Sequence, residues 1–156
     1  MSKDTHGEKG QPWTGFDLDG TLAEYHGWKG IEHIGKPVKR MCDIAKKLHS
    51  QGKLIKIFTA RVAPSPDHPD TSKVKKYIED WCQKNLGFVP PITYKKDALM
   101  EDFYDDRPKQ VIPNTGIEVE EAARQALELD GKDRKNSPEV KALLDYLKAA
   151  GCAPAI

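Results

Sequence analysis

The chain has 156 residues, of which 38% are apolar and 31% charged, and 25 lysines and arginines nearly balance 24 aspartates and glutamates. This composition excludes a disordered or collagen-like chain, and the net charge of +1 gives no general argument for binding nucleic acid or membranes. No apolar run approaches the ~18 residues of a membrane span, and the polar start lacks the apolar segment of a secretory signal. Because the three cysteines form no metal or disulfide pattern, we expect a cytoplasmic protein without zinc.

Short apolar runs mark the predicted strands. They lie at 13–16, 54–58, 92–94, 103–104 and 111–112. Amphipathic segments lie between the first three of these runs. This alternation favours a parallel sheet with helices on both faces and right-handed crossovers.

Two segments between these runs have helical spacing. Apolar residues from 38 to 48 follow Pro37, which a first helical turn tolerates, and Gly52 ends that helix. A second helix, with Val74 and Trp81 on its apolar face, follows a polar loop at 63–70. The sequence therefore predicts two helices that pack their apolar faces on the sheet.

The last third of the chain is predicted to be helical at 119–129 and 138–150. A polar turn, DGKDRKNS, is expected to separate these helices. We expect a single domain, residues 1–156, with a core at about 12–113 and a helical extension at about 114–156. The predicted fold class is α/β: a Rossmann-like three-layer sandwich with a mainly parallel central sheet, no separate cap domain and a helical C-terminal tail.

Acidic side chains follow two of the predicted strands. Asp17 and Asp19 come after the first strand, and Asp105 and Asp106 follow a later one. Ligands bind at the carboxyl ends of parallel strands, so we expect these four carboxylates to gather at one edge of the sheet. Gathered carboxylates repel one another unless a cation lies among them, and donors that are all oxygen favour Mg²⁺. The alternative is that they are ordinary helix caps or turn residues.

These acids belong to a set of motifs that resembles the haloacid dehalogenase superfamily. DLDGT follows a strand, Thr59 ends the strand LIKIF, a lysine lies at 95 or 96, and YDDR carries the second acidic pair. The motifs follow the family's order over about two thirds of the chain, although Gly15 stands where the family usually has a bulkier residue. Most members are Mg²⁺-dependent phosphatases with an aspartyl-phosphate intermediate, and the shortness of this chain resembles the capless members.

The resemblance implies a role for each acidic residue. Asp17 is expected to be the nucleophile that attacks phosphorus, and Asp19 the general acid and base that serves the leaving group and the water. Mg²⁺ is expected to be held by Asp17, the backbone carbonyl of Asp19 and Asp105, with Asp106 in or near the second layer of ligands.

The resemblance also implies a set of phosphate ligands. The Thr59 hydroxyl and nearby backbone N–H groups are expected to hold the phosphoryl oxygens, and Ala60 and Arg61 are expected to bind the substrate. The alternative for the Arg61 side chain is that it anchors a loop. A lysine is expected to offset the charge that develops on them. Of Lys95 and Lys96, the pattern of a lysine directly before an aspartate favours Lys96, and a solvated surface lysine is nearly as good an interpretation.

A glycine-rich segment at 22–36 occupies the position that is a mobile flap in this family. Tyr25 and Trp28 are candidates for contacting the leaving group, and an equally good interpretation packs Trp28 on the sheet edge. Neither gap between the motifs has room for a cap domain, since domains usually have at least ~50 residues. Two ways of excluding water stay open: a bulky or macromolecular phosphoester, or a neighbouring subunit of a homo-oligomer that closes the site.

The sequence thus predicts a Mg²⁺-dependent phosphomonoester hydrolase. Its expected partner is a phosphorylated small molecule or a phosphorylated nucleic-acid end, with no membrane partner. A nucleotidase or a nucleic-acid 3′-phosphatase is the alternative specialisation. A non-catalytic binding module with the same fold is the alternative of another class, and the presence of all four acids weighs against it.

Overall fold

A computed structural model describes residues 10–152, and the chain divides into two compact units, Met1–Asp106 and Arg107–Ile156. The sequence places the change from core to helical extension at about 113, a few residues further along. Each unit has its own hydrophobic core.

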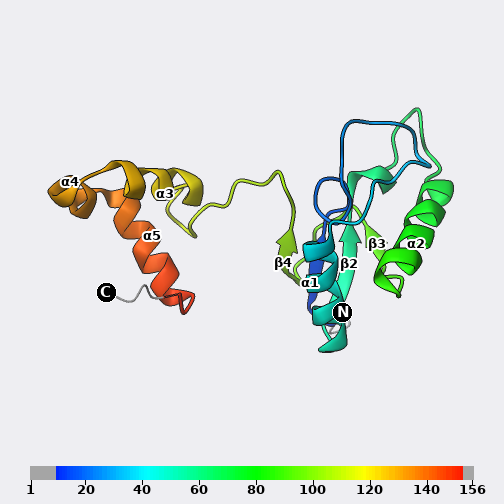
Figure 1. The fold of residues 1–156 in the computed structure, drawn as a ribbon, viewed down its shortest axis with the longest axis horizontal. Helices are drawn as coiled ribbons and strands as arrows, with labels where there is room; N and C mark the ends of the chain where they lie inside the picture. Colours follow the sequence, from blue (N-terminus) through cyan, green and yellow to red (C-terminus); the bar gives the residue numbers. More distant parts are fainter. Residues whose placement is uncertain (1–9, 153–156) are drawn as a thin grey trace, which may run out of the picture. The chain divides into compact units, whose positions relative to one another are not determined.

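The first unit contains a four-stranded sheet in which all strands are parallel (Figure 1). Its order is β3-β2-β1-β4, with β1 at Trp13–Phe16, β2 at Leu54–Phe58, β3 at Ile92–Thr93 and β4 at Met100–Tyr104. The predicted α/β class with a parallel central sheet is confirmed, because all four strands run parallel and helices alternate with the first three of them along the chain. The central strand β1 is buried along its whole length, as expected for a strand with a neighbour on each side.

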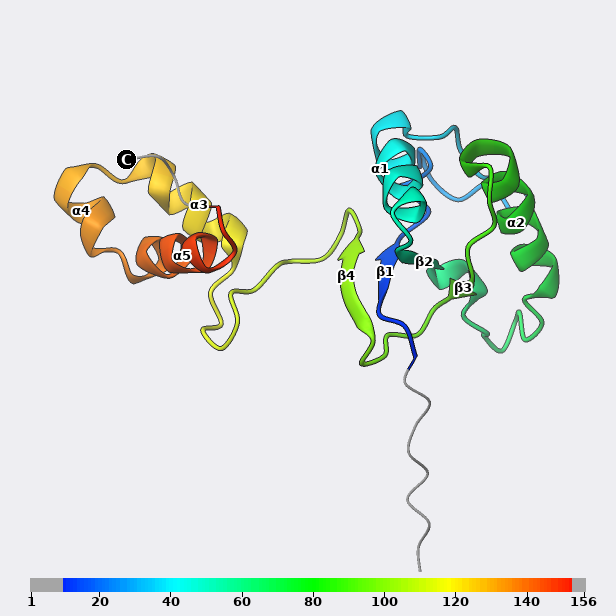
Figure 2. The ribbon, with the colours of Figure 1, turned by 90° about the horizontal axis from the view of Figure 1, so that it is seen from below.

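Helices α1 (Lys39–Ser50) and α2 (Ser72–Leu86) cover the same face of this sheet (Figure 2). Phe16 of β1 and Ile57 of β2 lie in register and belong to one core with Cys42 of α1 and Ile78 of α2. The chain moves in one direction across the sheet from β1 to β2 to β3. Two right-handed crossovers in the same direction place their helices on the same side.

The opposite face is covered differently, because the connection from β3 to β4 contains no helix. Trp13 Nε1 donates to Asp97 Oδ1 of this connection at 2.8 Å, and Lys56 Nζ lies 4.4 Å from the Trp13 ring centroid. A Cβ atom at Gly15 would come within 3.1 Å of the same ring, which explains the glycine there. The expectation of helices on both faces therefore holds for one face among the described residues of this unit.

The predicted fifth strand at 111–112 is wrong. Val111 forms only an isolated antiparallel bridge with Glu118, and the Ile112 N–H donates to the Ile117 carbonyl at 2.9 Å. Asn114 and Gly116, both with positive φ, turn the chain back so that this segment pairs with itself. Its backbone hydrogen bonds are satisfied locally rather than in the sheet.

The second unit is helical, with α3 at Val119–Glu128, α4 at Gly131–Asn136 and α5 at Pro138–Ala149. Helices α3 and α5 pack side by side (Figures 1 and 2) around a core of Ile112, Ala122 and Leu143. The prediction of a turn at 130–137 is wrong, because its lysines and arginine are good helix formers and supply the short helix α4. None of the described helices is both long and apolar enough to cross a membrane.

Candidate active site

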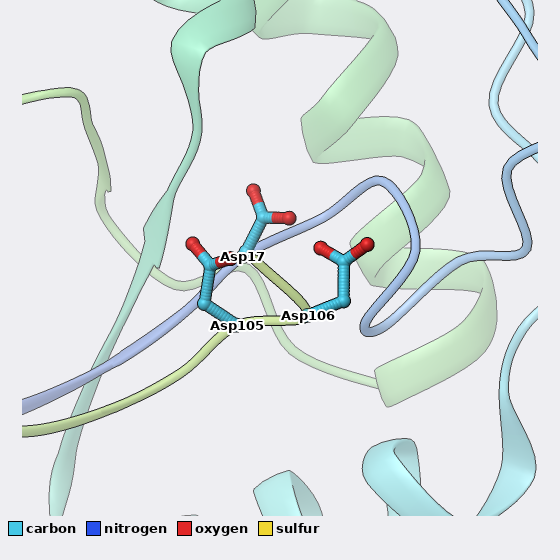
Figure 3. Close-up of side chains that lie close together, drawn as sticks. All are labelled: Asp17, Asp105 and Asp106. Carbon is cyan, nitrogen blue, oxygen red and sulfur yellow. The ribbon is translucent and has the colours of Figure 1, made fainter. Parts of the chain in front are cut away.

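Three of the four predicted acids meet at the carboxyl end of the sheet. Phe16 of β1 and Tyr104 of β4 are in register, so the residues that follow them, Asp17 and Asp105, emerge side by side. The Asp17 N–H donates to the Tyr104 carbonyl at 2.9 Å, which fixes this alignment. One carboxylate oxygen from each of Asp17, Asp105 and Asp106 lies within 4.8 Å of the others, and the three side chains project to the same side of the backbone (Figure 3). We call these three residues the acidic cluster.

The acidic cluster makes the charged form of Asp17 unfavourable. The pKa of Asp17 is raised from 3.8 to about 7, mainly by burial and to a smaller extent by the charges of Asp105, Asp19 and Asp106, while a backbone hydrogen bond at Leu18 acts in the opposite direction. A divalent cation among these oxygens would reverse the repulsion, and three carboxylates offer the hard oxygen donors that Mg²⁺ prefers. The residues present therefore fit the expected metal.

A glycine in the loop after β1 gives Asp106 its room. Gly20 has φ +87°, and a Cβ atom there would lie 2.6 Å from Asp106 Oδ2. The DLDGT motif thus needs glycine for two reasons, the left-handed backbone and the approach of Asp106.

Asp19, the fourth predicted acid, faces a different partner. Its Oδ2 accepts from Arg61 Nε at 2.6 Å and its Oδ1 from Arg61 Nη2 at 2.7 Å. The ion pair is well shielded, since the Asp19 side chain is 20% exposed and that of Arg61 only 5%. The expected cluster of four carboxylates is therefore a cluster of three, with Asp19 held beside it by a bidentate arginine.

Thr59 lies where the sequence predicts, directly after β2 and next to β1. It is buried, its N–H donates to the Thr93 carbonyl at 2.9 Å, and its Oγ1 accepts from the Arg61 N–H at 3.3 Å. The hydroxyl caps a single 3₁₀ turn, Ala60–Val62, in which Ala60 is exposed. A β-branched residue and a helix-cap hydroxyl at the same position give both the strand end and the turn.

The segment at 24–36, which we call the flap, is tied down at its base. The Glu24 N–H donates to the Lys36 carbonyl at 2.8 Å, and Trp81 Nε1 of α2 donates to the Gly35 carbonyl at 2.9 Å. A Cβ atom at Gly35 would lie 1.9 Å from the Glu24 carbonyl oxygen, so only glycine allows the two ends of the flap to approach this closely. Trp81 belongs to the core, as the sequence predicts, but its second role as a donor to the flap is missed; its indole N–H, which needs an acceptor, was the available signal.

A cavity of about 350 Å³ lies between the flap and the loop after β1. Asp19 and Arg61 line it, together with flap residues that include Tyr25, Lys29 and Lys36. Because Asp19 lines this cavity and its charge also acts on Asp17 of the acidic cluster, a group bound in the cavity would lie next to the expected general acid.

Trp28 contacts the ion pair rather than the sheet edge. The Arg61 guanidinium carbon lies 4.9 Å from the centroid of the Trp28 ring, and Trp28 is 58% exposed. The structure thus favours neither core packing nor direct exposure to a leaving group for this ring, and places it on the outer side of Arg61.

The structure does not bring the predicted lysine into the acidic cluster. Lys96 is exposed in the connection between β3 and β4, and its side chain makes no hydrogen bond or ion pair with the residues that the structure describes. The Lys95 ammonium lies 5.5 Å from the Tyr94 ring. In this structure Lys96 is therefore a solvent-exposed surface lysine.

The comparisons with known proteins add little to this geometry. No family model matches the chain, and no curated protein matches it. Among solved structures, the chain is similar to a "conserved protein coded by locus from Bacteroides thetaiotaomicron", with 17% identity over 82% of this chain and 99% of that one and a TM-score of 0.45. Similarity at this level assigns no activity to this chain.

Proposed function

We propose that the protein is a Mg²⁺-dependent phosphomonoester hydrolase that works through an aspartyl-phosphate on Asp17. The observation that carries the proposal is the acidic cluster, which combines oxygen donors for a hard cation with a carboxylate at the end of the central strand. A structural role for three adjacent carboxylates is disfavoured, because their mutual repulsion costs stability without a cation.

The proposed reaction has two displacements. An Asp17 carboxylate oxygen attacks phosphorus, the bond from phosphorus to the ester oxygen breaks, and Asp19 gives a proton to that leaving oxygen. A water then attacks the phosphorus of the aspartyl-phosphate, Asp19 takes its proton, and the bond to Asp17 breaks to release inorganic phosphate. The position of Asp19 between the acidic cluster and the cavity suits both proton transfers.

The remaining groups would bind and orient the phosphoryl group. Asp17 and Asp105 would hold Mg²⁺ together with Asp106, and the metal would supply positive charge that offsets the charge developing on the phosphoryl oxygens. Thr59 and the backbone that follows β2 would donate hydrogen bonds to the same oxygens. The flap cavity would receive the leaving group, with Tyr25, Lys29 and Lys36 around it.

Release of p-nitrophenol from its phosphate tests this proposal. We expect hydrolysis with Mg²⁺, loss of hydrolysis with EDTA, and a loss of at least about 10³-fold in Asp17→Asn, because the nucleophile is removed. Asp102→Asn is the matched control, since Asp102 is an exposed carboxylate of β4 outside the acidic cluster. Hydrolysis that survives chelation, or that persists in Asp17→Asn, would contradict the mechanism.

The substrate class is tested with a panel. A 3′-phosphorylated oligonucleotide, free nucleotides and phosphorylated sugars separate a nucleic-acid phosphatase, a nucleotidase and a metabolite phosphatase. Binding of Mg²⁺ without turnover of any of them would favour the non-catalytic binding module.

A further inference from the structure

Arg61 joins three segments that are distant in the sequence. Its Nε and Nη2 donate to the two oxygens of Asp19 in the loop after β1, at 2.6 and 2.7 Å. Its Nη2 also donates to the His33 carbonyl at 3.0 Å, and its Nη1 to the Ile31 carbonyl at 3.5 Å, both in the flap. Its own backbone follows β2 and donates to Thr59.

The donors of Arg61 are nearly all used inside the protein. A guanidinium has five N–H groups, and contacts to Asp19, His33 and Ile31 occupy four of them. The side chain is 5% exposed, and the Trp28 ring covers its outer side. A guanidinium with four of its five donors in use has little capacity to bind a phosphate of the substrate. This argues against the substrate-binding role that the sequence suggests for Arg61.

We propose that Arg61 is a positioning residue that holds the Asp19 carboxyl in place and fastens the flap over it. The inference rests on the proposed function, in which Asp19 transfers the protons. The bidentate contact fixes both the position and the plane of the Asp19 carboxyl, whereas the bonds to the Ile31 and His33 carbonyls hold the flap, in which His33 lines the cavity. Arg61 would therefore hold the Asp19 carboxyl at a fixed distance and orientation relative to the cavity that receives the leaving group.

A double-mutant cycle on p-nitrophenyl phosphate tests whether Arg61 acts through Asp19. We expect Arg61→Gln to lower kcat by at least about tenfold in the wild-type background and by no more than about twofold in an Asp19→Asn background. Arg61→Lys keeps the positive charge but loses the bidentate guanidinium, and we expect its kcat to lie between those of the wild type and Arg61→Gln. Arg40→Gln, an exposed arginine of α1, is the control. Equal losses in the two backgrounds, or a raised KM with unchanged kcat, would overturn the inference.

Acrylamide quenching of tryptophan fluorescence tests the flap end without any activity. Trp13 is 1% exposed and Trp81 9%, whereas Trp28 is 58% exposed, so quenching reports mainly on Trp28. We expect Arg61→Gln to raise the quenching constant, Arg40→Gln to leave it unchanged, and the rise to vanish when Trp28→Phe is added. An unchanged quenching constant in Arg61→Gln would overturn the flap contact even if the protein hydrolyses phosphate esters. Absence of hydrolysis with increased quenching would instead remove the proposed function and leave the contact standing.

Discussion

A carboxyl that is partly buried beside other carboxyls favours its protonated form, and Asp17 is in that position. Its pKa rises to about 7 first because of burial and then because of the charges of Asp105, Asp19 and Asp106. In the folded chain without a bound cation, the charged form of the Asp17 carboxyl is therefore disfavoured at neutral pH. A raised pKa is the kind of perturbation that catalytic and metal-binding carboxyls show.

The raised pKa gives the first prediction. Since the pKa of Asp17 is higher in the folded chain than the value of 3.8, the stability that protonated Asp17 contributes is fully present below about pH 4 and is lost as the pH rises through 7. We expect Asp17→Asn to be more stable than the wild type by about 1–3 kcal/mol at pH 8 without metal, a value reduced for solvent screening. Below about pH 4 the difference should vanish.

Urea unfolding of both proteins across this pH range, with EDTA present, measures the difference. Mg²⁺ added at pH 8 should stabilise the wild type and have much less effect on Asp17→Asn, because a ligand of the cation is missing. If Asp17→Asn is no more stable than the wild type at pH 8, the charged Asp17 carboxylate does not destabilise the metal-free protein, and the prediction is contradicted.

The loop after β1 is the element that turns a strand end into a site. The Ala23 N–H donates to the Leu18 carbonyl and the Gly20 N–H to the Ala23 carbonyl, both at 2.8 Å, so the loop is a compact, hydrogen-bonded turn. Its apolar members, Leu18, Leu22 and Ala23, are fully buried in the core below α1 and α2. Burial of these side chains anchors Asp19, which lies between Leu18 and Leu22, and Asp17, which directly precedes Leu18.

Gly20 gives the prediction at this scale, and Gly52 is its matched control. Both have positive φ, +87° and +80°, but a Cβ atom meets Asp106 at Gly20 and nothing within 4 Å at Gly52. Alanine at either position should lower the free energy of unfolding by about 1–2 kcal/mol, because the positive φ strains an alanine backbone. Only Gly20→Ala should also weaken Mg²⁺ binding, because Asp106 must move. Thermal unfolding and Mg²⁺ titration measure the two effects, and equal Mg²⁺ affinities in the two variants would contradict this account.

Elements with strong periodicity were predictable, and the others were not. The strands at 13–16 and 54–58 and the two helices that follow them appear as predicted, because their apolar residues repeat at the spacing of the structure they form. The segment at 111–112 has the composition of a strand, yet a nearby turn pairs it locally. The segment at 130–137 has the composition of a turn, yet it forms α4 next to α5. Short segments follow their surroundings more than their own propensity.

The whole molecule contains two units with separate cores, and every residue proposed for the site lies in the first. We therefore expect a chain that ends at Gln110 to fold and to keep Mg²⁺ affinity and turnover within about threefold of the full chain. Circular dichroism, calorimetry and the phosphatase assay measure this, with Asp17→Asn in the shortened chain as the control for background hydrolysis. Failure of the shortened chain to unfold cooperatively would show that the first unit depends on the second.

The sequence by itself determined the α/β fold class and three of the four acids that it expected in the cluster. Apolar runs that alternate with amphipathic segments favour a parallel sheet, and the carboxyl ends of parallel strands lie at one edge, so the meeting of Asp17 and Asp105 was predictable. Only the tertiary structure decided what each side chain faces. Asp19 and Arg61 are 42 residues apart and paired by the approach of the loop to the end of β2, and the flap meets α2 through Trp81. Local spacing specifies a strand or a helix, whereas the partner of a charged side chain depends on packing between distant segments, which periodicity does not encode.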